Sequence, residues 1–256
     1  MTSPGGGVRA VVRAVLRPFA VRNRRAVATL GLVLAALVGV NLAVNLGPLH
    51  TGLVVGPAVA VVLVVLARRA GLTWDDLGLA RRSWRRGALY AGLAIVSVAV
   101  VYATAVALPV TRLAFLDVRY RFQLGHALVS ALVIIPLSTV LIEEIAFRGV
   151  LLGLVKRHRG MVWASTSSSV LFGLWHILPS LGLGGANKAI VAVFGAGSGV
   201  KFLVVVAAVA FTALAGVLLC EMRRRSGSLL AAAGLHWATN ALGVLLAAAV
   251  WSLRAF

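Results

Sequence analysis

The chain has 256 residues, of which 61% are hydrophobic and only 12% are charged, and its mean hydropathy is +1.01. These values exclude a soluble globular domain and predict an all-α, polytopic transmembrane helical bundle. The formal net charge is +19, but in a chain this apolar the positions of the basic residues matter more than their sum. Those positions favour membrane lipid as a partner and argue against nucleic acid.

Residues 1–26 are predicted to precede the first transmembrane span. The stretch MTSPGGG (1–7) has the composition of a disordered tip. In the next twelve residues, Arg9, Arg13 and Arg17 recur every four residues opposite Val and Leu side chains. This pattern is typical of a basic amphipathic helix on anionic lipid, and a disordered basic tail is the alternative. The apolar run that follows has the length of a retained anchor and lacks a small-x-small cleavage site.

Residues 27–256 are predicted to form a transmembrane helical domain. Each span needs about 20 mostly apolar residues, and such runs occur at 27–46, 50–67, 87–110, 126–155, 161–178, 201–221 and 228–252. The direct interpretation is seven spans. The Gly-rich segment 179–200 contains an apolar patch too short to span, so it is predicted to be an outside loop, with a re-entrant path as the alternative. A crossing there would give eight helices.

The basic residues predict the orientation of the bundle. With the N-terminus in the cytoplasm, 18 of the 25 Lys and Arg residues fall in inside segments. One of these segments, 70–87, reads as a cytoplasmic loop with an interfacial helix anchored by Trp. The positive-inside rule therefore predicts a multi-pass protein of the cell membrane with a cytoplasmic N-terminus.

Three charged residues interrupt the fourth apolar run, in LIEEIAFRGVL (141–151). An ionisable group at the bilayer centre costs about 2.5 to 3.5 kcal/mol, so it faces the protein interior and has a partner or a task. Glu144 and Arg148 are four residues apart on one helix face, which allows a charge-assisted contact. Glu143 points about 100° away and has no partner in its own helix, which suits a general base. A purely structural ion pair is the alternative interpretation.

Two further runs carry polar side chains: His176 lies near the end of the fifth, and His236 with Asn240 forms an i, i+4 pair in the last. At 1.5 Å per residue from the nearest inner basic residue, Glu143, His176 and His236 lie at depths of about 20, 25 and 16 Å. These depths overlap, so we predict a single polar cavity.

Pro136 lies just before the glutamate pair. It should weaken the helix there, and Ser138 and Thr139 could satisfy the freed backbone groups, as expected beside a polar cavity.

Three short motifs occur in a fixed order on these apolar segments: EEIAFR (143–148), FGLWH (172–176) and HWATN (236–240). They match the EExxxR, FxxxH and HxxxN patterns of the CPBP family, also called the CAAX protease and bacteriocin-processing family. The chain resembles this family over about 126–245, and the resemblance implies an intramembrane endopeptidase with commonly eight spans.

The resemblance also implies a role for each site residue. Glu143 would activate water with help from His176, while Glu144 and Arg148 would set the local field. His236 and Asn240 would stabilise the tetrahedral oxyanion. Two mechanisms stay open: Glu143 acts as a base without metal, or Glu143, His176 and His236 hold a zinc ion with an open coordination position.

The leading prediction is a CAAX-protease-like endopeptidase, glutamate-type or metal-dependent, that cleaves a membrane-associated or lipidated peptide or protein. One alternative is a non-catalytic scaffold or immunity protein of the same fold. Another is a proton-coupled transporter that uses the same ionisable groups as a relay, although no internal repeat supports it. The sequence lacks HExxH, GxSxG and P-loop patterns, so other common hydrolase classes have no support.

Overall fold

The computed structural model describes residues 24–253, except 49, 122, 182, 184–186 and 196–197. The described residues form helices and no strand, with one isolated β-bridge between Asp117 and Asn187. The prediction of an all-α helical membrane bundle is therefore confirmed. The predicted disordered tip and basic amphipathic helix lie outside the described residues.

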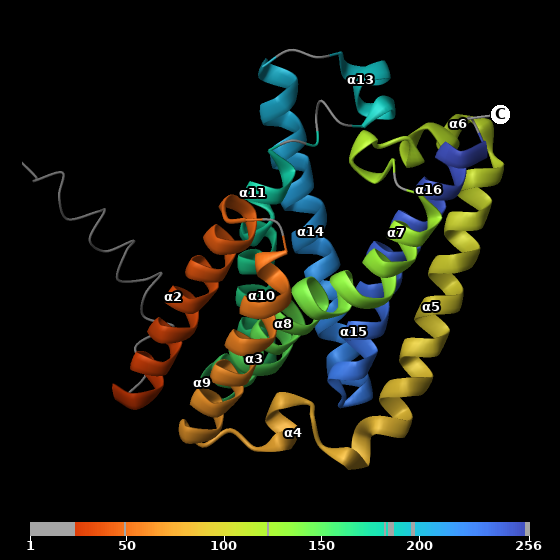
Figure 1. The fold of residues 1–256 in the computed structure, drawn as a ribbon. Coiled ribbons are helices and arrows are strands. Elements are labelled where there is room, and N and C mark those ends of the chain that lie inside the picture. Colours follow the sequence, from red (N-terminus) through yellow and green to blue (C-terminus); the bar gives the residue numbers. More distant parts are fainter. Residues whose placement is uncertain are drawn as a thin grey trace, which may run out of the picture.

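The long helices run back and forth along one axis, and short helices join them at the two ends (Figure 1). The first half of the chain contains α2 (Arg24–Leu46), α3 (Thr51–Arg69), α4 (Trp74–Leu77), η2 (Arg81–Ser83), α5 (Trp84–Ala107), α6 (Pro109–Arg112), η3 (Leu113–Phe115) and η4 (Val118–Tyr120). The second half contains α7 (Leu124–Val129), η5 (Ser130–Val140), α8 (Leu141–Glu143), η6 (Glu144–Leu151), α9 (Leu152–Arg159), α10 (Met161–Trp175), α11 (Ile177–Ser180), α13 (Lys188–Phe194), α14 (Ser198–Ser226), α15 (Leu229–Trp237), η7 (Ala238–Leu242) and α16 (Gly243–Leu253).

Among the described residues, six helices are long and apolar enough to cross a membrane: Val27–Leu46, Thr51–Arg69, Arg81–Ala107, Leu124–Arg159, Ser198–Ser226 and Leu229–Leu253. The predicted fifth span forms α10, which has only 15 residues and packs against α9 and α14. Segment 179–200 includes α13, whose seven residues are too few to cross. The count of seven or eight spans is thus not confirmed.

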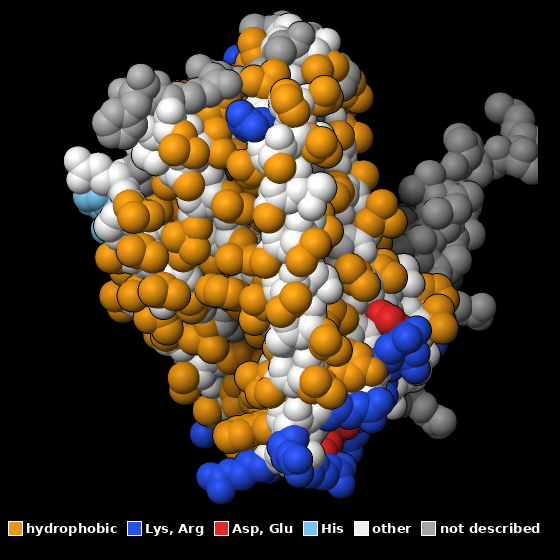
Figure 2. All heavy atoms as spheres, turned by 90° about the vertical axis from the view of Figure 1, so that its right-hand side faces the viewer, with side chains coloured by type: hydrophobic (Ala, Val, Ile, Leu, Met, Phe, Trp, Pro, Cys, Tyr) orange, Lys and Arg blue, Asp and Glu red, His pale blue; other side chains and the backbone are white. Residues whose placement is uncertain are grey.

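One end of the bundle, formed by α4 and the C-terminal ends of α3, α9 and α14, carries a cluster of basic residues and is called the basic end below. Arg157 Nη1 donates to the Gly71 carbonyl at 2.6 Å, and Arg223 Nη2 donates to the Asp75 and Asp76 carbonyls at 2.8 and 3.0 Å. These bonds hold the α3–α5 connection against α9 and α14. Figure 2 shows Lys and Arg gathered at this end, below a broad apolar belt.

The opposite end, called the distal end, is formed by the α2–α3 turn, the segment from α6 to η4, and α13 (Figure 1). Asn187 joins two of these parts because its Nδ2 donates to the Ala114 carbonyl at 2.9 Å.

The fourth span changes its helical winding where the polar residues lie. Its segments η5 and η6 are π-helical, and Pro136 lies inside η5. Ser138 Oγ donates to the Ile134 carbonyl at 2.6 Å, while the Ala131 carbonyl, five residues before Pro136, accepts from Trp237 Nε1 at 2.8 Å. π-helical turns are frequent at functional sites because they change the direction in which side chains point.

Candidate active site

The predicted pair of Glu144 and Arg148 forms the centre of a buried network. Arg148 Nη1 donates to Glu144 Oε1 at 2.9 Å, and His236 Nδ1 lies 2.8 Å from the same oxygen. The exposed fractions of Arg148, Glu144 and His236 are 0%, 1% and 5%. Since an isolated buried charge is strongly unfavourable, each of these groups depends on the others.

Phe172 is the aromatic wall of this network. The Arg148 guanidinium carbon lies 3.9 Å from the centre of its ring. The same ring meets His176 and His236 edge-on, with centroid distances of 4.7 and 5.7 Å. A buried cation over an aromatic face gains about 2 kcal/mol, which stabilises the buried guanidinium of Arg148.

Glu143 projects away from the ion pair, as its position in the helix predicts. Trp175 Nε1 donates to its Oε1 at 2.9 Å. Its Oε2 lies 3.7 Å from His236 Nε2 and has no hydrogen-bond partner within the part of the chain that the structure describes. The carboxylate is therefore fixed at one oxygen and free at the other.

Trp175 is a functional candidate that the sequence interpretation missed, because a tryptophan in an apolar helix looks like an ordinary packing residue. The available signal was its position next to His176, together with the need of a buried indole N–H for an acceptor. Its carbonyl accepts a hydrogen bond from Asn41 Nδ2 at 2.9 Å, so α2 also helps to position it.

His176 lies where α10 ends, with φ −85° and ψ 4°. Its Nδ1 is 2.8 Å from the Phe172 carbonyl. A carbonyl only accepts, so we assign the proton to Nδ1, which leaves Nε2 as an acceptor. The end of α10 thus presents a half-buried histidine with one free ring nitrogen.

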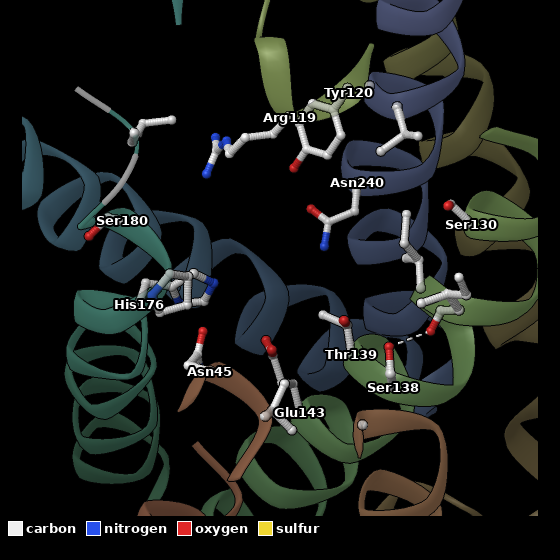
Figure 3. A pocket seen from close by; sticks show the side chains of 18 of the residues that line it. Asn45, Arg119, Tyr120, Ser130, Ser138, Thr139, Glu143, His176, Ser180 and Asn240 are labelled. Carbon is white, nitrogen blue, oxygen red and sulfur yellow. Dashed lines mark hydrogen bonds between the residues drawn. The ribbon is translucent and has the colours of Figure 1, made fainter. Parts of the chain in front are cut away.

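A cavity of about 1470 Å³ connects these elements, and Glu143, His176 and Asn240 line it. Figure 3 shows the three side chains pointing into the same space from α8, the end of α10 and η7. Thr139, Ser138 and Asn45 add further polar groups to the wall. Glu144, Arg148 and His236 are not lining residues and form the buried network behind Glu143.

A zinc site would require Glu143, His176 and His236 to surround one point. Among the described residues, no three His, Cys, Asp or Glu side chains are grouped so that they could hold a metal ion. His236 Nδ1 contacts Glu144, and its Nε2 lies 3.7 Å from Glu143 Oε2, an arrangement that by itself does not exclude a metal between His236 and Glu143. In the part of the chain that the structure describes, Glu143, His176 and His236 are therefore not grouped as a three-ligand zinc site.

The fold and the site define a helical membrane protein with a largely apolar cavity inside its bundle, into which a carboxylate and a few other polar side chains project. Residues 125–242 match the family model of the type II CAAX prenyl endopeptidase Rce1-like proteins. This segment is therefore an Rce1-like domain, which is consistent with the CPBP family that the three motifs predicted. Comparisons with curated proteins and with solved structures gave no match. The family supports an intramembrane endopeptidase in general.

Proposed function

We propose that the protein hydrolyses a peptide bond of a membrane-associated substrate, with Glu143 as the general base. The observation that carries this proposal is the Oε2 atom of Glu143, which is buried, without a described hydrogen-bond partner, and placed on a cavity wall. An unpaired buried carboxylate oxygen destabilises the fold, so a ligand of this oxygen, such as a water molecule, accounts for it.

In this mechanism a water molecule lies between Glu143 Oε2 and the free Nε2 of His176. Glu143 takes a proton from the water molecule while the water oxygen attacks the carbonyl carbon of the peptide bond. Asn240 Nδ2 donates to the oxyanion that forms on the carbonyl oxygen. Glu143 then returns the proton to the leaving amine as the carbon–nitrogen bond breaks, so protons balance and the base is regenerated.

The buried network supports this step from behind. Trp175 holds Oε1 of Glu143, which directs Oε2 towards the cavity. His236 is held by Glu144 and approaches Oε2 at 3.7 Å, so we assign it to orienting Glu143. Its predicted role as an oxyanion donor would require a rotation of its ring, because His236 does not line the cavity.

The test is Glu143→Gln in purified protein with a peptide library. Glutamine keeps an oxygen that can accept from Trp175, so the fold should be retained while the base is lost. We expect cleavage to fall by about 10²- to 10⁴-fold. The matched control is Glu221→Gln, which removes an exposed carboxylate that pairs with Arg224 and Arg225 and should leave cleavage unchanged.

Unchanged cleavage by Glu143→Gln would overturn the proposed mechanism. A non-catalytic member of the family would also be separated by this variant, because a scaffold or immunity function should persist without the base. A proton-coupled transporter would instead show uptake driven by a pH gradient in liposomes.

A further inference from the structure

The cavity that contains Glu143 extends towards the distal end of the bundle. Its lining includes residues of the α2–α3 turn, η4, the start of α7, α11 and α13: Pro48, His50, Arg119, His126, Ser180 and Ile190. None of the described lining residues belongs to α4 or to the basic ends of α3, α9 and α14. The entrance is thus opposite the basic end.

The basic end is closed below Glu143 by close packing. Arg148, Phe147 and Leu77 are at most 1% exposed and lie in or against one continuous buried core. The α3–α4 connection seals this region, because a Cβ atom at Gly153 of α9 would come within 2.6 Å of the Leu72 side chain. Passage of a peptide from this side would require the core to separate.

Arg119 is fixed at the distal entrance by Asp117, which is itself only 4% exposed. Arg119 Nε and Nη2 donate to the two Asp117 carboxylate oxygens at 3.0 and 2.7 Å. The Asp117 carbonyl accepts from Trp251 Nε1 at 3.1 Å, which ties the loop to α16. Figure 3 shows the guanidinium extended over the cavity, on the side away from Glu143.

The Asp117 hydrogen bond raises the pKa of Arg119, although partial burial opposes this shift. Its guanidinium therefore stays charged. The two bonds to Asp117 use Nε and Nη2, and the side chain of Arg119 lines the cavity. Since Asp117 occupies the Nε and Nη2 edge of the guanidinium, the Nη1 side is the part that can donate a charge-assisted hydrogen bond to a substrate carboxylate.

We propose that the substrate enters from the distal end, that this end faces away from the cytoplasm, and that Arg119 binds a carboxylate of the substrate there. The proposal rests on the proposed function and names its substrate class: a peptide or protein end exposed on the outer side of the membrane. The orientation follows from the positive-inside rule, which places the basic end in the cytoplasm.

The side of entry is tested by thiol labelling, which does not depend on catalysis. The single cysteine of the chain, Cys220, is buried, so the unsubstituted protein is the blank. His126→Cys places a thiol at the cavity entrance and Arg82→Cys places one at the basic end. On intact cells a membrane-impermeant maleimide should label the first variant and should label the second only after permeabilisation.

The reverse labelling pattern would overturn the outer orientation. A second readout tests the path itself: a bulky maleimide on His126→Cys should block cleavage, measured against the same variant before labelling. The same reagent on Arg82→Cys should not. If labelling agrees but no cleavage is found in any form, the entrance stands and the proposed function fails.

The role of Arg119 is tested by kinetics with Arg119→Gln, with Arg121→Gln as the neighbouring control. We expect Arg119→Gln to raise KM by about tenfold or more with little change in kcat, and Arg119→Lys to recover part of the affinity. Two sets of modified peptides should identify the bound carboxylate: peptides with an amidated C-terminus, and peptides with Asn and Gln in place of their acidic residues. For the set that lacks this carboxylate, the KM values of Arg119→Gln and the wild type should be equal.

An equal rise in KM for all peptides, including neutral ones, would show that Arg119 only supports the loop. A dependence on the content of anionic lipid, without dependence on peptide charge, would assign Arg119 to a lipid headgroup. Both results contradict the proposal.

Discussion

Replacing Arg148 by methionine should destabilise the protein strongly without touching the cavity wall. The guanidinium is completely buried and pairs with Glu144 at 2.9 Å. Removing it leaves a carboxylate that is 1% exposed and whose remaining partner, within the described part of the chain, is His236. Breaking a buried ion pair from one side costs about 3 to 5 kcal/mol, so we expect the free energy of unfolding to fall by this amount.

The double variant with Glu144→Gln distinguishes an ion pair from two independent packing residues. Glutamine keeps an oxygen that can accept from His236 Nδ1, while methionine fills much of the arginine volume. Since neither charge remains uncompensated, the double variant should lose less stability than either single variant. The coupling energy of the cycle should exceed about 2 kcal/mol.

The assay is reversible unfolding in mixed detergent micelles, followed by tryptophan fluorescence. The control is Glu221→Gln, which breaks the surface pairs with Arg224 and Arg225 and should leave the free energy of unfolding nearly unchanged, because surface ion pairs contribute little to stability. Additive losses, or a cost of Arg148→Met below about 1 kcal/mol, would refute the view that Glu144 and Arg148 are held as a buried ion pair.

Three further changes test the positioning of the site and its scaffold. Trp175→Phe removes the donor to Glu143 Oε1, so kcat should fall about tenfold with KM unchanged; an unchanged kcat would contradict the positioning role. Gly56→Ala places a Cβ 2.9 Å from the Leu137 carbonyl and should lower the free energy of unfolding by about 1 to 3 kcal/mol. The control is Gly31→Ala, whose Cβ meets nothing within 4 Å and should leave stability unchanged. Thermal unfolding in detergent measures both variants. Asp76 belongs to the capping box at the start of α4. Burial alone would raise the pKa of its carboxyl group, but hydrogen bonds from Thr73 and the charges of Arg157 and Lys156 lower this pKa below its ordinary value of 3.8. The charged Asp76 carboxylate therefore stabilises the fold above pH 3.8, and this contribution is lost as the pH falls through the lowered pKa. The difference in the free energy of unfolding between wild type and Asp76→Asn should narrow below about pH 4. A difference that does not change with pH would contradict this role of Asp76.

The charged residues of the site could be predicted from sequence because a bilayer tolerates them only with partners. The Glu144–Arg148 contact follows from a four-residue spacing in a helix, and the structure forms it at 2.9 Å. The depths of Glu143 and His176 followed from counting residues along their spans, and both side chains line one cavity.

The rotation of side chains about the helix axis could not be predicted in the same way. His236 and Asn240 were expected on one face because they are four residues apart. The segment η7 after Trp237 is π-helical, and its i to i+5 bonding changes the alignment of i and i+4 positions. As a result Asn240 reaches the cavity while His236 lies behind Glu143. The end of α10 at Trp175 could not be predicted either, because the residue that follows it is His176 and not a helix-breaking Pro or Gly.

The residues of the site come from two parts of the chain, one inside and one outside the segment that matches the family. The segment 125–242 supplies the carboxylates, the histidines and Asn240, and is the part that matches the Rce1-like family. Two residues that we propose to position the site and admit the substrate lie before this segment: Asn41 of α2 donates to the Trp175 carbonyl, and Arg119 of η4 lines the cavity. The match over 125–242 supports an intramembrane endopeptidase in general. Under the proposals above, the choice of peptide depends in part on residues that the match does not cover.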